Sequence, residues 1–140
     1  MRNKETEKLF KLAYTDAMTG VYKRNAYEEK LEKLNKVNAR LDNIMVVIVD
    51  LDKLKCINDT YGHRTGDDAI KTVADCILNT VGKKADIYRI GGDEFVCIAE
   101  RDISSYIAEL RDLISFVGKE KLYPLSVSLG YSRFDTRKDK

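Results

Sequence analysis

The chain has 140 residues, of which 44% are hydrophobic, enough for one domain with a single core. Its 25 basic and 23 acidic residues are interspersed and leave a net charge of only +2, which argues against a nucleic-acid binder. The three cysteines form no CxxC pair, and this argues against a zinc site or a disulfide framework.

The first part of the chain predicts two helices followed by a buried strand. The opening MRNKETEKLF has no apolar run long enough for a signal peptide or a membrane segment, so we expect a cytoplasmic location. Residues 4–14 predict a short charged helix, and residues 16–20 predict a turn. Apolar residues three or four apart predict an amphipathic helix over 25–41. The β-branched run at 44–49 predicts a central strand buried on both faces.

The second part predicts a helix from Asp68 to Val81, with Asp67 near its N-cap. Short strands at 86–90 and 95–99 flank a hairpin loop, a further helix follows over 103–117, and a last strand covers 125–131. After the leading helices the order is therefore β-α-β-β-α-β. This order favours an α+β, ferredoxin-like sandwich with an antiparallel sheet and flanking helices.

Acidic residues occur at two places that this topology brings together. With the first strand in the centre and the second hairpin strand beside it, the stretch from Asp50 to Asp52 would lie near Asp93 and Glu94. Up to four carboxylates would converge, and they would repel one another by several kcal/mol unless cations intervened. Mg²⁺ prefers such oxygen ligands, and a pair of metals can activate a hydroxyl and stabilise a leaving pyrophosphate.

Each of these acidic motifs also has an interpretation without a functional role. Strand ends and hairpin tips are exposed to solvent, so acidic residues occur there by chance, and short motifs match often. The combination on adjacent strand ends is what favours a metal site. Gly91 and Gly92 fit it, because glycines allow a tight turn and the close approach of a nucleotide.

Three stretches of the sequence resemble one known family. Residues 91–95, GGDEF, are identical to the signature of the GGDEF-domain, or diguanylate cyclase, family. Residues 50–67, DLDKLKCINDTYGHRTGD, resemble its other long motif, and residues 16–24, DAMTGVYKR, resemble the stretch that opens the domain. The resemblance implies that residues 16–140 form the GGDEF domain and that residues 1–15 form a linker or stalk helix.

The resemblance implies a metal site and a catalytic base. Asp50 and Asp93 would hold Mg²⁺ or Mn²⁺ through their side chains, and the carbonyl of Leu51 would be a backbone ligand. Glu94 would be a neighbouring carboxylate of the same site. Asp93 would also be the base that accepts the proton of a ribose 3′-hydroxyl.

The resemblance also implies a site for GTP. Asn58 and Asp67 would contact the guanine edge, which suits an amide and a carboxylate. His63 would lie by the bound nucleotide, and backbone N–H groups over 53–55 would meet the phosphates, with Lys55 supplying charge. Structural alternatives stay open: His63 only organises the loop, Asp67 is only an N-cap, and Asn58 only closes a turn.

The implied reaction condenses two GTP into cyclic di-GMP, a bacterial second messenger, with release of two pyrophosphates. Each protomer would bind one GTP, so catalysis would require a homodimer, at least transiently, and a sensor domain could precede the chain. The alternative is a catalytically impaired GTP-binding regulatory or output module. The intact set of Asp50, Asp93 and Glu94 favours the enzyme.

Two departures from the family pattern support further expectations. Family members usually continue past the strand near Tyr131 into a helix with phosphate-binding basic residues, and we expect this helix to be missing here. Its loss would weaken triphosphate binding by ~1.5–3 kcal/mol. Gly82 and Ala85 stand where many members carry an Arg-x-x-Asp product-inhibition site, so we expect no product inhibition there.

Overall fold

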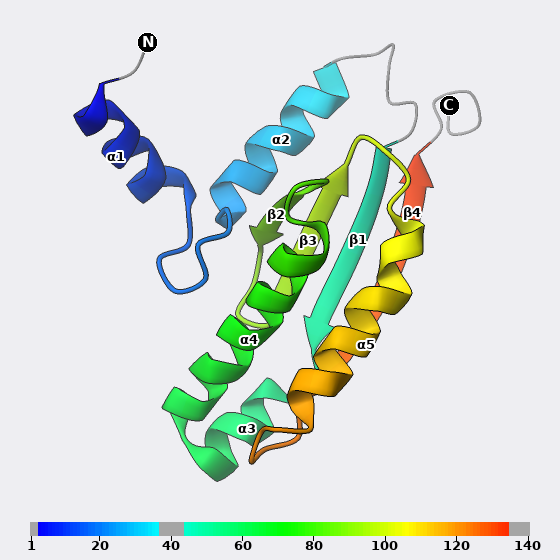
Figure 1. Cartoon of the computed structure of the whole chain (residues 1–140). Helices are drawn as coiled ribbons and strands as arrows, with labels where there is room; N and C mark the ends of the chain where they lie inside the picture. The colour runs from blue at the N-terminus through cyan, green and yellow to red at the C-terminus, as the bar shows by residue number, and fades with distance from the viewer. Residues whose placement is uncertain (1–2, 37–43, 135–140) are drawn as a thin grey trace.

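The computed structural model describes residues 3–36 and 44–134 of the chain (Figure 1). The helices are α1 (Lys4–Tyr14), α2 (Arg24–Lys36), α3 (Leu54–Tyr61), α4 (His63–Val81), the short 3₁₀ helix η1 (Ser104–Tyr106) and α5 (Ile107–Gly118). The strands are β1 (Ile44–Leu51), β2 (Asp86–Arg89), β3 (Glu94–Ala99) and β4 (Val127–Phe134). No helix in these two ranges is both long and apolar enough to cross a membrane.

The four strands form one sheet in the order β2-β3-β1-β4, and every neighbouring pair is antiparallel. Helices α4 and α5 lie together on one face of this sheet (Figure 1). The predicted α+β, ferredoxin-like arrangement is therefore confirmed. This arrangement places the C-terminal end of β1 and the start of β3 at the same edge.

The main core lies between the sheet and α4 and α5. Side chains of a strand alternate between its two faces, and on β1 the residues that face this core are buried: Met45, Val47, Val49 and Leu51. The matching face of α4 is Ala69, Ile70, Val73, Ala74, Ile77 and Val81. Burial of this apolar surface is the main force that fixes the register of β1, because a slip by one residue would expose it.

The second face of the sheet is covered only in part, so the prediction that β1 is buried on both faces is wrong at one position. A smaller cluster places Tyr27 and Leu34 of α2 against Tyr88 and Val96. Helix α2 thus covers the β2 and β3 side of the sheet. Ile48 of β1 points to the same face beyond this cover, and 42% of its surface is exposed.

Several local predictions differ from the structure, and the last strand, for example, covers Val127–Phe134 rather than 125–131. Helix α3 was not predicted, although Leu54, Ile57 and Tyr61 have helical spacing. Helix α4 starts at His63 rather than Asp68, because Gly62, with φ 95°, breaks the chain direction just before it. The predicted helix over 25–41 begins at Arg24 and continues to Lys36, and the rest of that prediction falls outside the described residues.

Candidate functional site

The edge where β1 ends and β3 begins brings together the two acidic stretches. Asp50 and Glu94 are directly paired across the antiparallel strands. The backbone N–H of Leu51 donates to the carbonyl of Asp93 at 2.8 Å. The expected proximity of the two stretches is therefore confirmed at the level of the backbone.

The electrostatic state of Asp50 reflects its acidic neighbours. Burial raises the pKa of its carboxyl, and the negative charges of Asp93 and then Asp52 raise it further. Like charges disfavour ionisation of a half-buried carboxylate in this way. The three side chains are thus close enough to interact, and a cation placed among their oxygens would relieve the repulsion.

Asp52 points toward β4 rather than toward a common centre. Its carboxylate accepts hydrogen bonds from the hydroxyls of Ser126 at 3.0 Å and Ser128 at 2.7 Å. Its backbone N–H donates to the carbonyl of Ser126 at 2.9 Å. Sequence reasoning missed these serines, although their alternation in LSVSLGY placed them on one face of the last strand.

The stretches that carry the four carboxylates therefore meet at one sheet edge, as expected, but the Asp52 carboxylate is engaged by β4. Over 3–36 and 44–134, no group of three or more His, Cys, Asp or Glu side chains is arranged to hold a metal ion. The oxygen donors at this edge include the carboxylates of Asp50, Asp93 and Glu94 and nearby backbone carbonyls. Mg²⁺ in nucleotide sites commonly takes just one or two carboxylates and completes its shell with water and phosphate oxygens.

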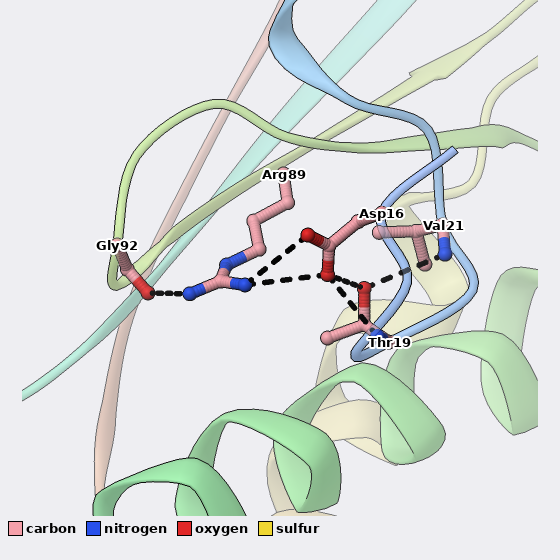
Figure 2. A network of polar contacts seen from close by, with 5 residues as sticks. All are labelled: Asp16, Thr19, Val21, Arg89 and Gly92. Atoms are coloured by element: carbon pink, nitrogen blue, oxygen red, sulfur yellow. Dashed lines mark hydrogen bonds and ion pairs between the residues drawn. The ribbon is translucent and has the colours of Figure 1, made fainter. Parts of the chain in front are cut away.

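The hairpin that carries Asp93 is held by a network of polar contacts (Figure 2). Arg89, at the end of β2, donates to both carboxylate oxygens of Asp16 at 3.2 and 3.3 Å and to the carbonyl of Gly92 at 2.9 Å. Thr19 donates to Asp16 through its hydroxyl and its backbone N–H. Neither Asp16 nor Arg89 was predicted as part of the site, although Asp16 opens one stretch that resembles the family and Arg89 lies two residues before another.

The N-terminus of α3 follows β1 after only two residues. Lys53 occupies its N-cap position with φ 57° and ψ 37°, a left-handed conformation that costs a non-glycine residue roughly 1–2 kcal/mol. No side chain of Lys53 caps the helix, so the first N–H groups of α3 are suited to an anionic ligand. The side chain of Lys55, in the first turn, is exposed.

Helices α3 and α4 carry three more of the residues that were predicted to contact the nucleotide. Asn58 is half-buried in α3, His63 is the exposed first residue of α4, and Asp67 is exposed within α4. Asp67 is therefore not an N-cap, and that prediction was wrong, because Gly62 holds the N-cap position. The turn after α3 closes through the backbone carbonyl of Asn58, which accepts from the N–H of Gly62 at 2.9 Å.

A separate cavity of about 420 Å³ lies away from this edge, at the turn that contains Gly82 and Ala85. Basic side chains gather around it: Lys30, Lys83, Lys84 and Arg101. Asp86 and Glu100 also line it, and Lys30 lies 4.0 Å from Glu100. The absence of product inhibition at this place stays a prediction.

Comparison with known proteins agrees with this geometry. Residues 13–139 match the family model described as "Diguanylate cyclase, GGDEF domain". The chain is 43% identical over 95 residues to "Probable diguanylate cyclase DgcJ" of Escherichia coli K12, covering 67% of this chain and 19% of that protein. It is 35% identical over 109 residues to "Cyclic di-GMP phosphodiesterase PdeR" of the same organism, covering 77% and 16%.

A solved structure shows the same fold. The coiled coil and GGDEF domain of DgcB from Caulobacter crescentus, in complex with c-di-GMP, superposes with a TM-score of 0.81 and 26% identity. The match covers 96% of this chain and 76% of that one. The chain spans less than a fifth of the length of each of the two curated relatives named above.

Proposed function

Because the chain belongs to the GGDEF-domain family of diguanylate cyclases, we propose that it condenses two GTP molecules into cyclic di-GMP and releases two pyrophosphates. The observation that carries this proposal is the pairing of the Asp50 and Asp93 stretches at one sheet edge. The raised pKa of Asp50 reflects the nearby negative charges of Asp93 and Asp52, which a divalent cation would neutralise.

The residues at this edge fit Mg²⁺ or Mn²⁺, because all the available donors are oxygen atoms. The carboxylates of Asp50 and Asp93 and the carbonyl of Leu51 would hold the ion, with Glu94 as a neighbouring carboxylate. When bound, the ion would neutralise negative charge on the triphosphate and on the attacking oxygen. Mg²⁺ in nucleotide sites commonly takes one or two carboxylates, so phosphate oxygens and water would complete its shell here.

Helix α3 and the first turns of α4 would bind the nucleotide. The N–H groups at the N-terminus of α3 and the charge of Lys55 would contact the phosphates. Asn58 and Asp67 would contact the guanine edge, with His63 nearby. The bare turn at Gly91 and Gly92, both exposed, would let the sugar and phosphates come close to the backbone.

The chemical step would need little more than alignment and a proton acceptor. Asp93 would accept the proton of a ribose 3′-hydroxyl, whose oxygen would then attack the α-phosphorus of the second GTP and expel pyrophosphate. Because each protomer would bind one GTP, two protomers would have to meet, at least transiently. In this proposal residues 16–140 form the catalytic domain, and residues 1–15 form a stalk that can follow a sensor domain.

A second candidate is a GTP-binding regulatory module without turnover. The similarity to a protein named as a cyclic di-GMP phosphodiesterase favours it, because a domain of this kind then accompanies another activity.

Incubation with GTP and Mg²⁺, followed by chromatography and mass spectrometry, tests the enzyme. We expect cyclic di-GMP and pyrophosphate in a 1:2 ratio, no product from ATP, and no product from Asp93→Asn. GTP binding by calorimetry without any dinucleotide would leave only the regulatory module. A protein that neither binds GTP nor makes a product would contradict both candidates.

A further inference from the structure

Gly66 lies against the side chain of Asn58. A β carbon built on Gly66 would stand 1.7 Å from Oδ1 of Asn58, 2.8 Å from its Cγ and 3.4 Å from its Nδ2. These are the three nearest heavy atoms, and all belong to the Asn58 side chain. Gly66 is buried, whereas Asn58 is half-buried. The Asn58 amide therefore occupies the space that a side chain at position 66 would need.

Backbone freedom does not explain the glycine. Gly66 is inside α4, where its N–H donates to the carbonyl of Gly62 at 3.2 Å, and the positive φ angles among the described glycines belong to Gly20 and Gly62. Glycine is a poor helix former, so alanine would be the better residue for a helix at this position. Space for a neighbour is the remaining physical reason for glycine here.

The contact between Asn58 and Gly66 brings Asn58 to the part of α4 that carries Asp67, the second residue that would contact guanine. Gly66 directly precedes Asp67 on α4, so the Asn58 amide from α3 rests on the α4 backbone one residue before Asp67. Guanine carries an acceptor at O6 and a donor amine at N2, whereas adenine carries a donor at N6. A group that can both donate and accept, set beside a carboxylate that only accepts, distinguishes these edges when their spacing is fixed.

We propose that Gly66 is a specificity-determining position that seats the Asn58 amide for guanine recognition. This inference rests on the proposed function, because it assumes that Asn58 contacts the base. Gly66→Ala should fold, since the atoms it displaces are at the end of one short side chain that can rotate away. The displaced amide would then no longer meet the guanine edge.

A double-mutant cycle tests the inference: the wild-type chain, Gly66→Ala, Asn58→Ala and the double variant. Calorimetry with GTP and with ATP, in the presence of Mg²⁺, gives the affinities. We expect Gly66→Ala to weaken GTP binding about tenfold, a typical effect of losing one hydrogen bond to a base, without strengthening or weakening ATP binding. In the Asn58→Ala background the same change should alter GTP affinity less than about twofold, because the atoms that clash are gone.

Gly130→Ala is the matched control. Gly130 lies in β4, and no heavy atom stands within 4 Å of a β carbon built on it, so GTP affinity should change less than about twofold. In ligand-free protein, the side-chain amide signals of Asn58 in an NMR spectrum should shift in Gly66→Ala and not in Gly130→Ala. The melting temperature of Gly66→Ala should stay equal or rise, because alanine favours the helix.

The outcomes separate this inference from the proposed function. Wild-type protein that does not bind GTP would overturn both. Unchanged GTP binding in Asn58→Ala would remove Asn58 from the guanine site and the inference with it, while leaving the metal edge and catalysis intact. If Asn58→Ala weakens binding but Gly66→Ala does not, or if Gly66→Ala weakens it equally in both backgrounds, the inference alone is wrong.

Discussion

Arg89 and Asp16 are 73 residues apart in the chain, and they form an ion pair with a distance of 3.2 Å between Nη1 and Oδ2. Their side chains are 15% and 22% exposed, so water screens the pair only weakly. The same guanidinium donates to the carbonyl of Gly92. The turn before Asp93 is therefore attached to the segment that connects α1 with α2, as Figure 2 shows.

Replacing Asp16 by Ala should destabilise the fold. The change leaves a poorly solvated guanidinium without its carboxylate, and we expect a loss of ~2–3 kcal/mol in the free energy of unfolding from urea denaturation. The matched control is Glu28→Ala, which removes an exposed ion pair with Arg24 and should cost at most about 0.5 kcal/mol. Equal losses for the two variants would show that the Arg89 pair is no stronger than a surface pair.

The contribution of Asp16 should depend on pH. Burial raises the pKa of its carboxyl, but the hydrogen bond from Thr19 and the charge of Arg89 outweigh burial and hold the pKa below the ordinary value of 3.8. Such a group stabilises the fold above pH 3.8, and its contribution is lost as pH falls through the lowered pKa. The stability difference between wild type and Asp16→Asn should thus be constant near neutrality and shrink in acid. A difference that grew on acidification would contradict this sign.

Asp50 should show the opposite dependence in metal-free protein. Burial, Asp93 and Asp52 raise the pKa of Asp50 above 3.8, so its ionised form destabilises the fold. Protonated Asp50 stabilises the fold relative to the ionised form. This stabilisation is present below pH 3.8 and is lost as pH rises through the raised pKa. Asp50→Asn should therefore melt at an equal or higher temperature at pH 7, and the gain should vanish in acid. Thermal melts in a chelating buffer measure it, and a marked drop at pH 7 would argue for a structural carboxylate.

Tyr123 should contribute more to stability than the lysine that shares its partner. The hydroxyl of Tyr123 donates to Asp68 at 2.7 Å, and Lys121 donates to the same oxygen at 2.8 Å. Tyr123 is 7% exposed, so Tyr123→Phe should cost about 1 kcal/mol. Lys121→Ala should cost about 0.5 kcal/mol or less, because Asp68 is 51% exposed. Urea denaturation of both variants gives the order, and the reverse order would contradict the assignment.

Ile77 and Leu78 compare the two sides of α4. Ile77 is fully buried against the sheet, whereas Leu78 is 38% exposed. Ile77→Ala should lose about 3–4 kcal/mol, because it removes buried methyl groups and leaves a cavity. Leu78→Ala should lose about 1 kcal/mol or less. A similar loss for both would mean that α4 presents a different face to the sheet.

Much of this protein could be predicted from the order of its residues. The apolar run at 44–49 and the helical spacing from Ile70 to Val81 depend on local periodicity, and both elements form, although α4 starts earlier than predicted and one face of β1 is partly exposed. The element order then fixed the sheet, because short connections and antiparallel pairing leave few arrangements. The antiparallel pairing of β1 with β3 also brings the acidic residues at the C-terminal end of β1 and in the hairpin to one edge. Residues 91–95 pointed to the family without any coordinates.

Tertiary structure alone decided where the side chains of the site point. Asp52 turns to Ser126 and Ser128, Arg89 reaches Asp16, and Asn58 fills the space at Gly66. These contacts depend on strand register, on the helix break at Gly62 and on the packing of α3 against α4. The periodicity of a sequence relates only residues within about one helical turn of each other. Each of these contacts joins residues further apart, so it depends on how the whole intervening backbone folds.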